Sequence, residues 1–263
     1  MNPDIVVDIG NSLVKWGRCA EHEVVERVSL PADAPEAWQK QLDAWKLAGP
    51  LSWAVASVVP AHREFLVKWL RNRGHSCLVI ERAAQLPLTV GVNEPDKVGI
   101  DRLLNAVAAK RWRSGEDVAI IVDAGSAVTV DCVDDKGRFC GGAIFPGLRL
   151  MAECLHEHTA LLPLVRVDDD NIEVPGRDTI KAMETGILYA VAGGIAALVH
   201  EFVVRGTPSL DAMRNVDTFV TGGDAPLLVP TLKRLLLPIQ AHRLIPSFFM
   251  TLEGIRMAAE ALP

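Results

Sequence analysis

Ile5-Val6-Val7-Asp8-Ile9-Gly10-Asn11-Ser12 lies near the start of the chain, and its Asp-x-Gly pattern returns at Asp123-Ala124-Gly125-Ser126-Ala127. Each copy stands between two apolar runs, which predicts two strands joined by a glycine turn, a β-hairpin. Glycine lets the backbone approach a phosphate closely, and an Asp at a strand end suits Mg²⁺, which usually takes one or two protein carboxylates. Asp and Gly are also common in turns that bind nothing. Two copies in matching contexts favour a site for a nucleotide and a metal.

Helices and strands alternate in the rest of each half. We expect strands over 53–56, 77–80, 118–123, 127–133, 139–145 and 216–220, and helices over 35–47, 62–73, 148–157, 178–204, 226–236 and 252–262. An α/β order repeated in two halves predicts two related domains, 1–114 and 115–263, with an active-site cleft between them. The last helix either belongs to the second domain or packs back on the first.

Composition limits the partners and the compartment. The formal net charge is −6, from 27 basic and 33 acidic residues, which argues against nucleic acid because such binding depends on neutralising phosphates. The five cysteines form no C-x-x-C pair. This pattern predicts reduced thiols in a cytoplasmic protein and no metal site built on sulfur.

One apolar stretch, 186–204, approaches the ~20 residues that a membrane crossing needs. It contains Gly193-Gly194, ends near His200-Glu201 and lacks flanking aromatic anchors. A helix that is apolar all round can also lie inside a large core. We therefore expect a buried helix and no membrane association.

A second group of polar residues, Gly99-Ile100-Asp101-Arg102, precedes a helical apolar pattern, so Asp101 and Arg102 lie on the first turn of a helix. A carboxylate beside an acceptor hydroxyl can orient it and take its proton, and an arginine can neutralise charge during phosphoryl transfer. The alternative is an acidic residue that favours the helix N-terminus, with Arg102 as its ion-pair partner.

Two further glycine turns, Gly141 to Gly147 and Thr221-Gly222-Gly223-Asp224, each follow an expected strand and precede an expected helix. Turns of this kind expose N–H groups toward a phosphate or adenine, although helix packing alone also selects glycine there.

Together and in this order, these motifs resemble the type III pantothenate kinases. That family includes proteins named Bvg accessory factors and belongs to the superfamily of acetate and sugar kinases, Hsp70 and actin. The resemblance spans nearly the whole chain. It implies an α/β fold of two duplicated, actin-like and ribonuclease H-like domains, a homodimer, and ATP-dependent phosphorylation of pantothenate to 4'-phosphopantothenate, the first step of coenzyme A biosynthesis.

The resemblance also implies roles for individual residues. Asp101 is the general base, Asp8 helps to hold the Mg²⁺ that accompanies ATP, and Asp123 binds a monovalent cation, K⁺ or NH₄⁺. The implied ATP-binding residues are Asp8, Ile9, Gly10, Asn11, Ser12, Leu13, Val14, Lys15 and Ser126. The implied pantothenate-binding residues are Val92, Gly99, Ile100, Asp101, Arg102 and Thr179.

Two positions depart from the family pattern. Val92 stands where the family commonly has Tyr, and Asp178 replaces the usual Asn before Thr179. An extra negative charge near a carboxylate substrate is unfavourable unless a cation offsets it. Two alternatives therefore stay open: a catalytically weak or inactive paralogue with a regulatory, nucleotide-binding role, and a kinase or phosphatase of the same superfamily that acts on another small acceptor.

Overall fold

The computed structural model describes residues 1–10, 13–115, 117–169, 172–205, 216–236 and 242–262. Its contacts divide the chain into two compact units, one made of residues 1–111 and 249–263 and the other of residues 112–248. Each unit is a set of residues that make most of their contacts with one another. The domain ranges expected from the sequence, 1–114 and 115–263, stay a prediction.

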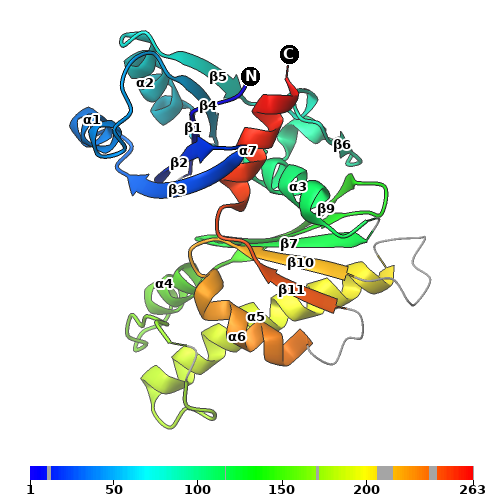
Figure 1. Ribbon diagram of the computed structural model, residues 1–263. Helices are drawn as coiled ribbons and strands as arrows, with labels where there is room; N and C mark the ends of the chain where they lie inside the picture. The colour runs from blue at the N-terminus through cyan, green and yellow to red at the C-terminus, as the bar shows by residue number, and fades with distance from the viewer. Residues whose placement is uncertain (11–12, 116, 170–171, 206–215, 237–241, 263) are drawn as a thin grey trace. The chain divides into compact units, whose positions relative to one another are not determined.

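The first unit is built on a five-stranded sheet in the order β3-β2-β1-β4-β5 (Figure 1). Its strands are β1 (Ile5–Ile9), β2 (Val14–Ala20), β3 (Glu23–Leu30), β4 (Ser52–Ser57) and β5 (Ser76–Ile80). Neighbouring pairs β1–β2 and β2–β3 are antiparallel, whereas β1–β4 and β4–β5 are parallel. The expected first hairpin is thus the central part of this sheet.

Helices cover both faces of the first sheet. One face packs against α1 (Pro35–Ala44) and α2 (Pro60–Arg71) through a core rich in tryptophan. The rings of Trp16 and Trp53 meet edge to face at 4.8 Å, and those of Trp38 and Trp69 at 5.4 Å, a geometry that adds stability beyond burial alone. The opposite face carries α7 (Met250–Ala261), which contacts all five strands.

The connection from β5 to the last part of the first unit contains little regular structure before α3 (Ile100–Trp112). It includes the two-residue strand β6 (Thr89–Val90) and two short 3₁₀ turns, Ala83–Gln85 and Pro95–Lys97. α7 also packs closely on α3, because a Cβ atom added at Gly254 would overlap the backbone of Leu104.

Five strands of the second unit repeat this arrangement in the order β9-β8-β7-β10-β11 (Figure 1). Its strands are β7 (Val118–Ala124), β8 (Ala127–Val133), β9 (Arg138–Pro146), β10 (Val216–Thr221) and β11 (His242–Pro246). β7–β8 and β8–β9 are antiparallel, and β7–β10 and β10–β11 are parallel. β7 therefore takes the place in the second sheet that β1 takes in the first, which confirms the expected duplication.

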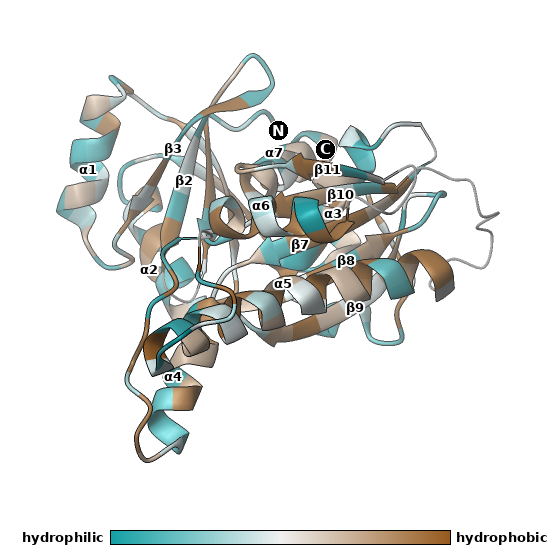
Figure 2. Ribbon diagram, turned by 90° about the horizontal axis from the view of Figure 1, so that it is seen from below, coloured by the Kyte–Doolittle hydropathy of each residue, from teal (hydrophilic) through white to brown (hydrophobic). Residues whose placement is uncertain are grey.

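Three helices, α4 (Leu148–His158), α5 (Thr179–Arg205) and α6 (Ala225–Leu236), share one core with the second sheet. α5 and α6 lie side by side (Figure 1). Much of α5 is brown or pale in Figure 2, which marks apolar or neutral residues. Residues 179–204 are long and apolar enough to cross a membrane by length and composition alone. Of the 18-residue stretch that meets this criterion, 33% is buried. The side that includes Ile187, Val191 and Ile195 is part of the core. The expectation of a buried helix therefore holds for this side only, because most of the helix is not buried.

The expected elements mostly match, but three strands, β3, β6 and β11, were missed. β3 was not expected because most of its side chains are exposed, so no apolar alternation marks it. β11 was also missed. α2 begins two residues before the expected start because Pro60 occupies its first position, where a missing N–H costs nothing.

Candidate active site

The β1–β2 hairpin places Asp8 and Lys15 directly opposite each other. Lys15 Nζ lies 3.6 Å from Asp8 Oδ2, and the Asp8 side chain is only 11% exposed. At the turn, Gly10 N–H donates to the Leu13 carbonyl at 3.0 Å. The expected contacts Asn11 and Ser12 lie outside the described residues.

The remaining expected residues of this hairpin differ in what they offer. Ile9 and Val14 are 1% exposed and belong to the core, whereas Leu13 is 51% exposed. Ile9 and Val14 could therefore contact a ligand only through their backbone groups. Among the expected ATP-binding residues of this hairpin that the structure describes, the polar side chains are those of Asp8 and Lys15.

The start of α3 carries the expected group Gly99 to Arg102, with Asp101 in the first turn. Asp101 Oδ1 accepts a hydrogen bond from the Arg102 backbone N–H at 2.9 Å, and Arg102 N–H is also 3.1 Å from the Gly99 carbonyl oxygen. Ile100 is buried, whereas Asp101 and Arg102 are partly exposed. The Asp101 carboxylate is thus held locally but keeps a second oxygen for another partner.

The β7–β8 hairpin aligns Asp123 with two hydroxyl side chains. Asp123 is opposite Thr129 in β8 and beside Thr221 in β10, so the three side chains share one face of the sheet. Thr129 Oγ1 is buried and has no hydrogen-bond partner among the described residues. Carboxylate and hydroxyl oxygens suit a hard cation such as K⁺ or Mg²⁺.

A metal held wholly by side chains is not evident. In the described part of the chain there is no group of three or more His, Cys, Asp and Glu placed to hold a metal ion. A cation near Asp8 or Asp123 would need hydroxyl or backbone oxygens, water or ligand oxygens to complete its shell, which is how Mg²⁺ is usually bound beside phosphates.

Three glycine turns of the second unit are joined by backbone hydrogen bonds. Gly147 N–H donates to the Ser126 carbonyl at 3.0 Å, and Asp224 N–H donates to the Ala124 carbonyl at 2.9 Å. A Cβ atom at Gly147 would overlap the Gly125 carbonyl oxygen, and Gly222 has a φ of +96°, so both positions require glycine. The turns after β7, β9 and β10 therefore form one rigid edge of the unit.

One side chain from these turns, that of Arg149, lies beside Ser126. Arg149, in the first turn of α4, has its Nη2 atom 3.4 Å from Ser126 Oγ and its Nη1 atom 2.6 Å from Glu153 Oε1. Burial raises the pKa of Asp224, and the Arg149 guanidinium acts in the opposite direction. Sequence reasoning missed Arg149, because its neighbour Ser126 lies 23 positions away and no local motif joins them.

The chain matches one protein family over most of its length. A family model described as type III pantothenate kinase matches residues 5–201. The chain belongs to the type III pantothenate kinase family. It is 32% identical to the type III pantothenate kinase of Methylacidiphilum infernorum, over 98% of this chain and 88% of that relative. It is 31% identical to that of Geobacter sulfurreducens, over 97% and 98%.

Solved structures support the fold of this type III pantothenate kinase family member. The activator of the 2-hydroxyisocaproyl-CoA dehydratase from Clostridium difficile aligns with a TM-score of 0.55 at 14% identity, over 98% of this chain and 96% of that one. MreB5 of Spiroplasma citri aligns with a TM-score of 0.54 at 14% identity, over 99% of both chains. At such low identity these likenesses concern the fold alone, which is actin-like.

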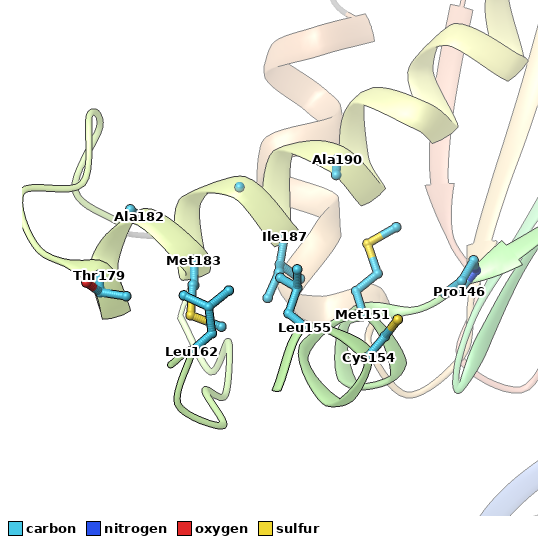
Figure 3. A pocket seen from close by; sticks show the side chains of 11 residues that line it. Pro146, Met151, Cys154, Leu155, Leu162, Thr179, Ala182, Met183, Ile187 and Ala190 are labelled. Atoms are coloured by element: carbon cyan, nitrogen blue, oxygen red, sulfur yellow. The ribbon is translucent and has the colours of Figure 1, made fainter. Parts of the chain in front are cut away.

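Within this family member, Thr179 is the first residue of α5 and lines a mainly apolar pocket of about 610 Å³ (Figure 3). The pocket lies between α4 and α5, with Met151, Leu155 and Ile187 in its wall. Pro146, which pairs with Ala127 of the β7–β8 hairpin, also lines this pocket.

The two departures from the family pattern have different consequences. Asp178 Oδ1 accepts a hydrogen bond from Lys181 N–H at 2.8 Å, which is the role of a helix N-cap. Asn and Asp cap helices about equally well, so the exchange preserves the start of α5. Val92 lies partly exposed in the bend after β6 and offers neither a hydroxyl nor a ring.

Proposed function

We propose that Asp101 is the general base of the reaction that this chain catalyses. As a member of the type III pantothenate kinase family, the chain phosphorylates pantothenate with ATP, the first step of coenzyme A biosynthesis. The observation that carries the base assignment is the Asp101 carboxylate at the start of α3, tied to Arg102 N–H through one oxygen. Its other oxygen can accept the proton of the pantothenate hydroxyl.

For ATP, we assign the phosphates to the backbone of residues 8–15, to Lys15 and to Ser126. The described side chains support this assignment, because Lys15 supplies positive charge beside Asp8 and Ser126 lies exposed at a rigid turn. Asp8 would hold Mg²⁺ through its carboxylate. When bound, Mg²⁺ would neutralise charge that develops on the phosphates during transfer.

For the monovalent cation, K⁺ or NH₄⁺, we assign Asp123 as the charged ligand. The Thr129 hydroxyl on the same face, which has no hydrogen-bond partner in the described part of the chain, supports a neighbouring oxygen ligand. The turn after β7 would then hold the nucleotide beside the bound monovalent cation. Positioning and charge neutralisation supply most of the catalysis in phosphoryl transfer.

For pantothenate, we assign Val92, Gly99, Ile100, Asp101 and Arg102 of the first unit, and Thr179 of the second. Arg102 offers the positive charge that a carboxylate substrate needs. Val92 adds only apolar surface. If the reaction needs the hydroxyl group that Tyr supplies in the family, another residue must take over its role. The rate of pantothenate phosphorylation measures whether another residue does so.

We further propose a homodimer that works in the cytoplasm, without nucleic acid or membrane. The apolar pocket beside α5 supports a dimer, as does the exposure of Ile180, which follows the pocket residue Thr179 in the chain and is 48% exposed. Light scattering on Ile180→Glu should give a lower mass than the unaltered protein. Val25→Glu, on the first unit at 43% exposure, is the matched control and should leave the mass unchanged.

The activity is tested by ADP release with ATP, Mg²⁺ and K⁺, with and without pantothenate and with Na⁺ replacing K⁺. Pantothenate-dependent and K⁺-dependent release supports the proposal. Asp101→Asn should lower turnover at least ~100-fold with little effect on ATP binding. Asp96→Asn, in the short turn before α3, is the control and should stay close to the unaltered enzyme.

Two outcomes would change the assignment. Nucleotide binding without turnover under any cation would favour a catalytically weak paralogue with a regulatory role, the alternative that Val92 supports. ATP hydrolysis that ignores pantothenate would favour another acceptor. Near-normal turnover of Asp101→Asn would remove Asp101 from the base role while leaving the family reaction intact.

A further inference from the structure

The edge formed by the three glycine turns of the second unit carries little positive charge. Residues 123–127, 146–149 and 221–225 include two carboxylates, Asp123 and Asp224, and a single basic residue, Arg149. A polyphosphate that reaches Ser126 would meet repulsion from these acids unless a cation compensates. Arg149 is the side chain of this edge that can do so.

The position of Arg149 is suited to that task. Its guanidinium lies 3.4 Å from the Ser126 hydroxyl, and its field acts on the neighbouring Asp224. The backbone bond from Gly147 N–H to the Ser126 carbonyl fixes the start of α4 against the turn. Arg149 and Ser126 are therefore held as a pair by the chain itself.

The ion pair between Arg149 and Glu153 costs little free energy to break. Its partner Glu153 is one helical turn away, and the two side chains are 62% and 32% exposed. An exposed ion pair at this spacing contributes only a small stabilisation. The guanidinium can thus leave Glu153 at little cost, and a phosphate offers it a stronger bidentate partner.

We infer that Arg149 is a nucleotide-binding residue whose guanidinium binds phosphate oxygens of the nucleotide at Ser126, with Glu153 holding it in place when no nucleotide is bound. The inference rests on the proposed ATP-dependent function. It adds a phosphate ligand that neither the repeated Asp-x-Gly motif nor the glycine turns indicate.

Calorimetric titration with ADP, ATP and adenosine tests it on four proteins: the unaltered chain, Arg149→Gln, Arg149→Lys and Glu153→Gln. Arg149→Gln should weaken ADP and ATP binding by about tenfold or more, as expected for a lost hydrogen bond to a charged group, and should leave adenosine binding nearly unchanged. Arg149→Lys should recover part of the loss because it keeps the charge. Glu153→Gln should bind no more weakly than the unaltered chain, because it removes a competitor.

The outcomes separate the inference from the function on which it rests. ADP binding within twofold of the unaltered value in Arg149→Gln would overturn the inference alone. Equal losses in Arg149→Gln and Glu153→Gln, or an equal loss for adenosine, would also overturn it, since both indicate a merely structural ion pair. Absence of nucleotide binding by the unaltered chain would instead overturn the ATP-dependent function and the inference with it.

Discussion

Asp8 and Lys15 are opposite residues of the β1–β2 hairpin, and the Lys15 ammonium lies 3.6 Å from the Asp8 carboxylate. Asp8 is almost buried, whereas Lys15 is 39% exposed. A nearly buried carboxylate is costly without a partner. Lys15 therefore compensates Asp8 and still presents its charge toward solvent.

Lys15→Gln should weaken ATP binding by about tenfold, because the variant loses a charged donor to phosphate. The KM for ATP and the nucleotide affinity by calorimetry measure this effect. Lys40→Gln, at an exposed position of α1, is the control. An unchanged KM in Lys15→Gln would exclude Lys15 from the nucleotide site.

Arg256→Met should destabilise the protein by about 3 kcal/mol, because removal of one partner of a buried ion pair leaves the other charge unpaired. Arg256 lies 2.7 Å from Glu253, and both side chains are less than 10% exposed. Glu253 also accepts the Val24 N–H bond, so it ties α7 to β3. Urea denaturation measures the change.

The exposed pair Arg18–Glu26 is the matched control for that experiment. Arg18→Gln should cost less than about 1 kcal/mol. Equal losses in the two variants would contradict the importance that we give to burial of the Arg256 pair.

Glu260 gives a prediction about pH. Burial raises the pKa of Glu260, but hydrogen bonds from His22 and Arg256 outweigh it, so the pKa is lowered overall. A carboxylate whose folded pKa is depressed contributes stability above its unfolded pKa of about 4.3 and loses that contribution as the pH falls through the folded value. Glu260→Gln should therefore be less stable than the unaltered protein at pH 7, and the difference should shrink below pH 4. A difference that is constant with pH would contradict this linkage.

Gly254→Ala should destabilise the first unit by about 1–3 kcal/mol, because the added methyl group would overlap the Leu104 backbone where α7 crosses α3. Gly193→Ala in α5 is the helical control, since its added Cβ meets no atom within 4 Å. Alanine is the better helix former by about 1 kcal/mol, so this control should be neutral or stabilising. Thermal unfolding of both variants gives the comparison, and equal melting temperatures would be the contrary result.

The sequence predicted the two hairpins well, because apolar strands on both sides of an Asp-x-Gly turn are a strong local signal. It also placed Asp101 correctly on the first turn of α3, where the apolar period of the helix begins. Strand β3 was not predicted because it is mostly exposed and lacks an alternation of apolar and polar residues. Its place in the sheet depends on backbone pairing with β2, which no local pattern records.

Contacts between distant segments explain what else the sequence did not predict. Arg149 reaches Ser126 only because the Gly147 backbone is bonded to the Ser126 turn. The value of Asp178 as a helix cap likewise emerges only from its bond to Lys181 N–H. In the sequence, the exchange of Asn for Asp178 indicated an unfavourable charge near the substrate. In the structure, the Asp178 carboxylate caps the start of α5.

The return of α7 to the first sheet has a consequence for the order of events during synthesis. Residues 112–248 form one uninterrupted stretch, whereas the first unit needs residues 249–263 as well as 1–111. Chains emerge from the ribosome with the N-terminus first, and units usually fold in that order. Here the second unit has all of its residues before α7 exists, so the unit whose strands are made first is the last to be completed.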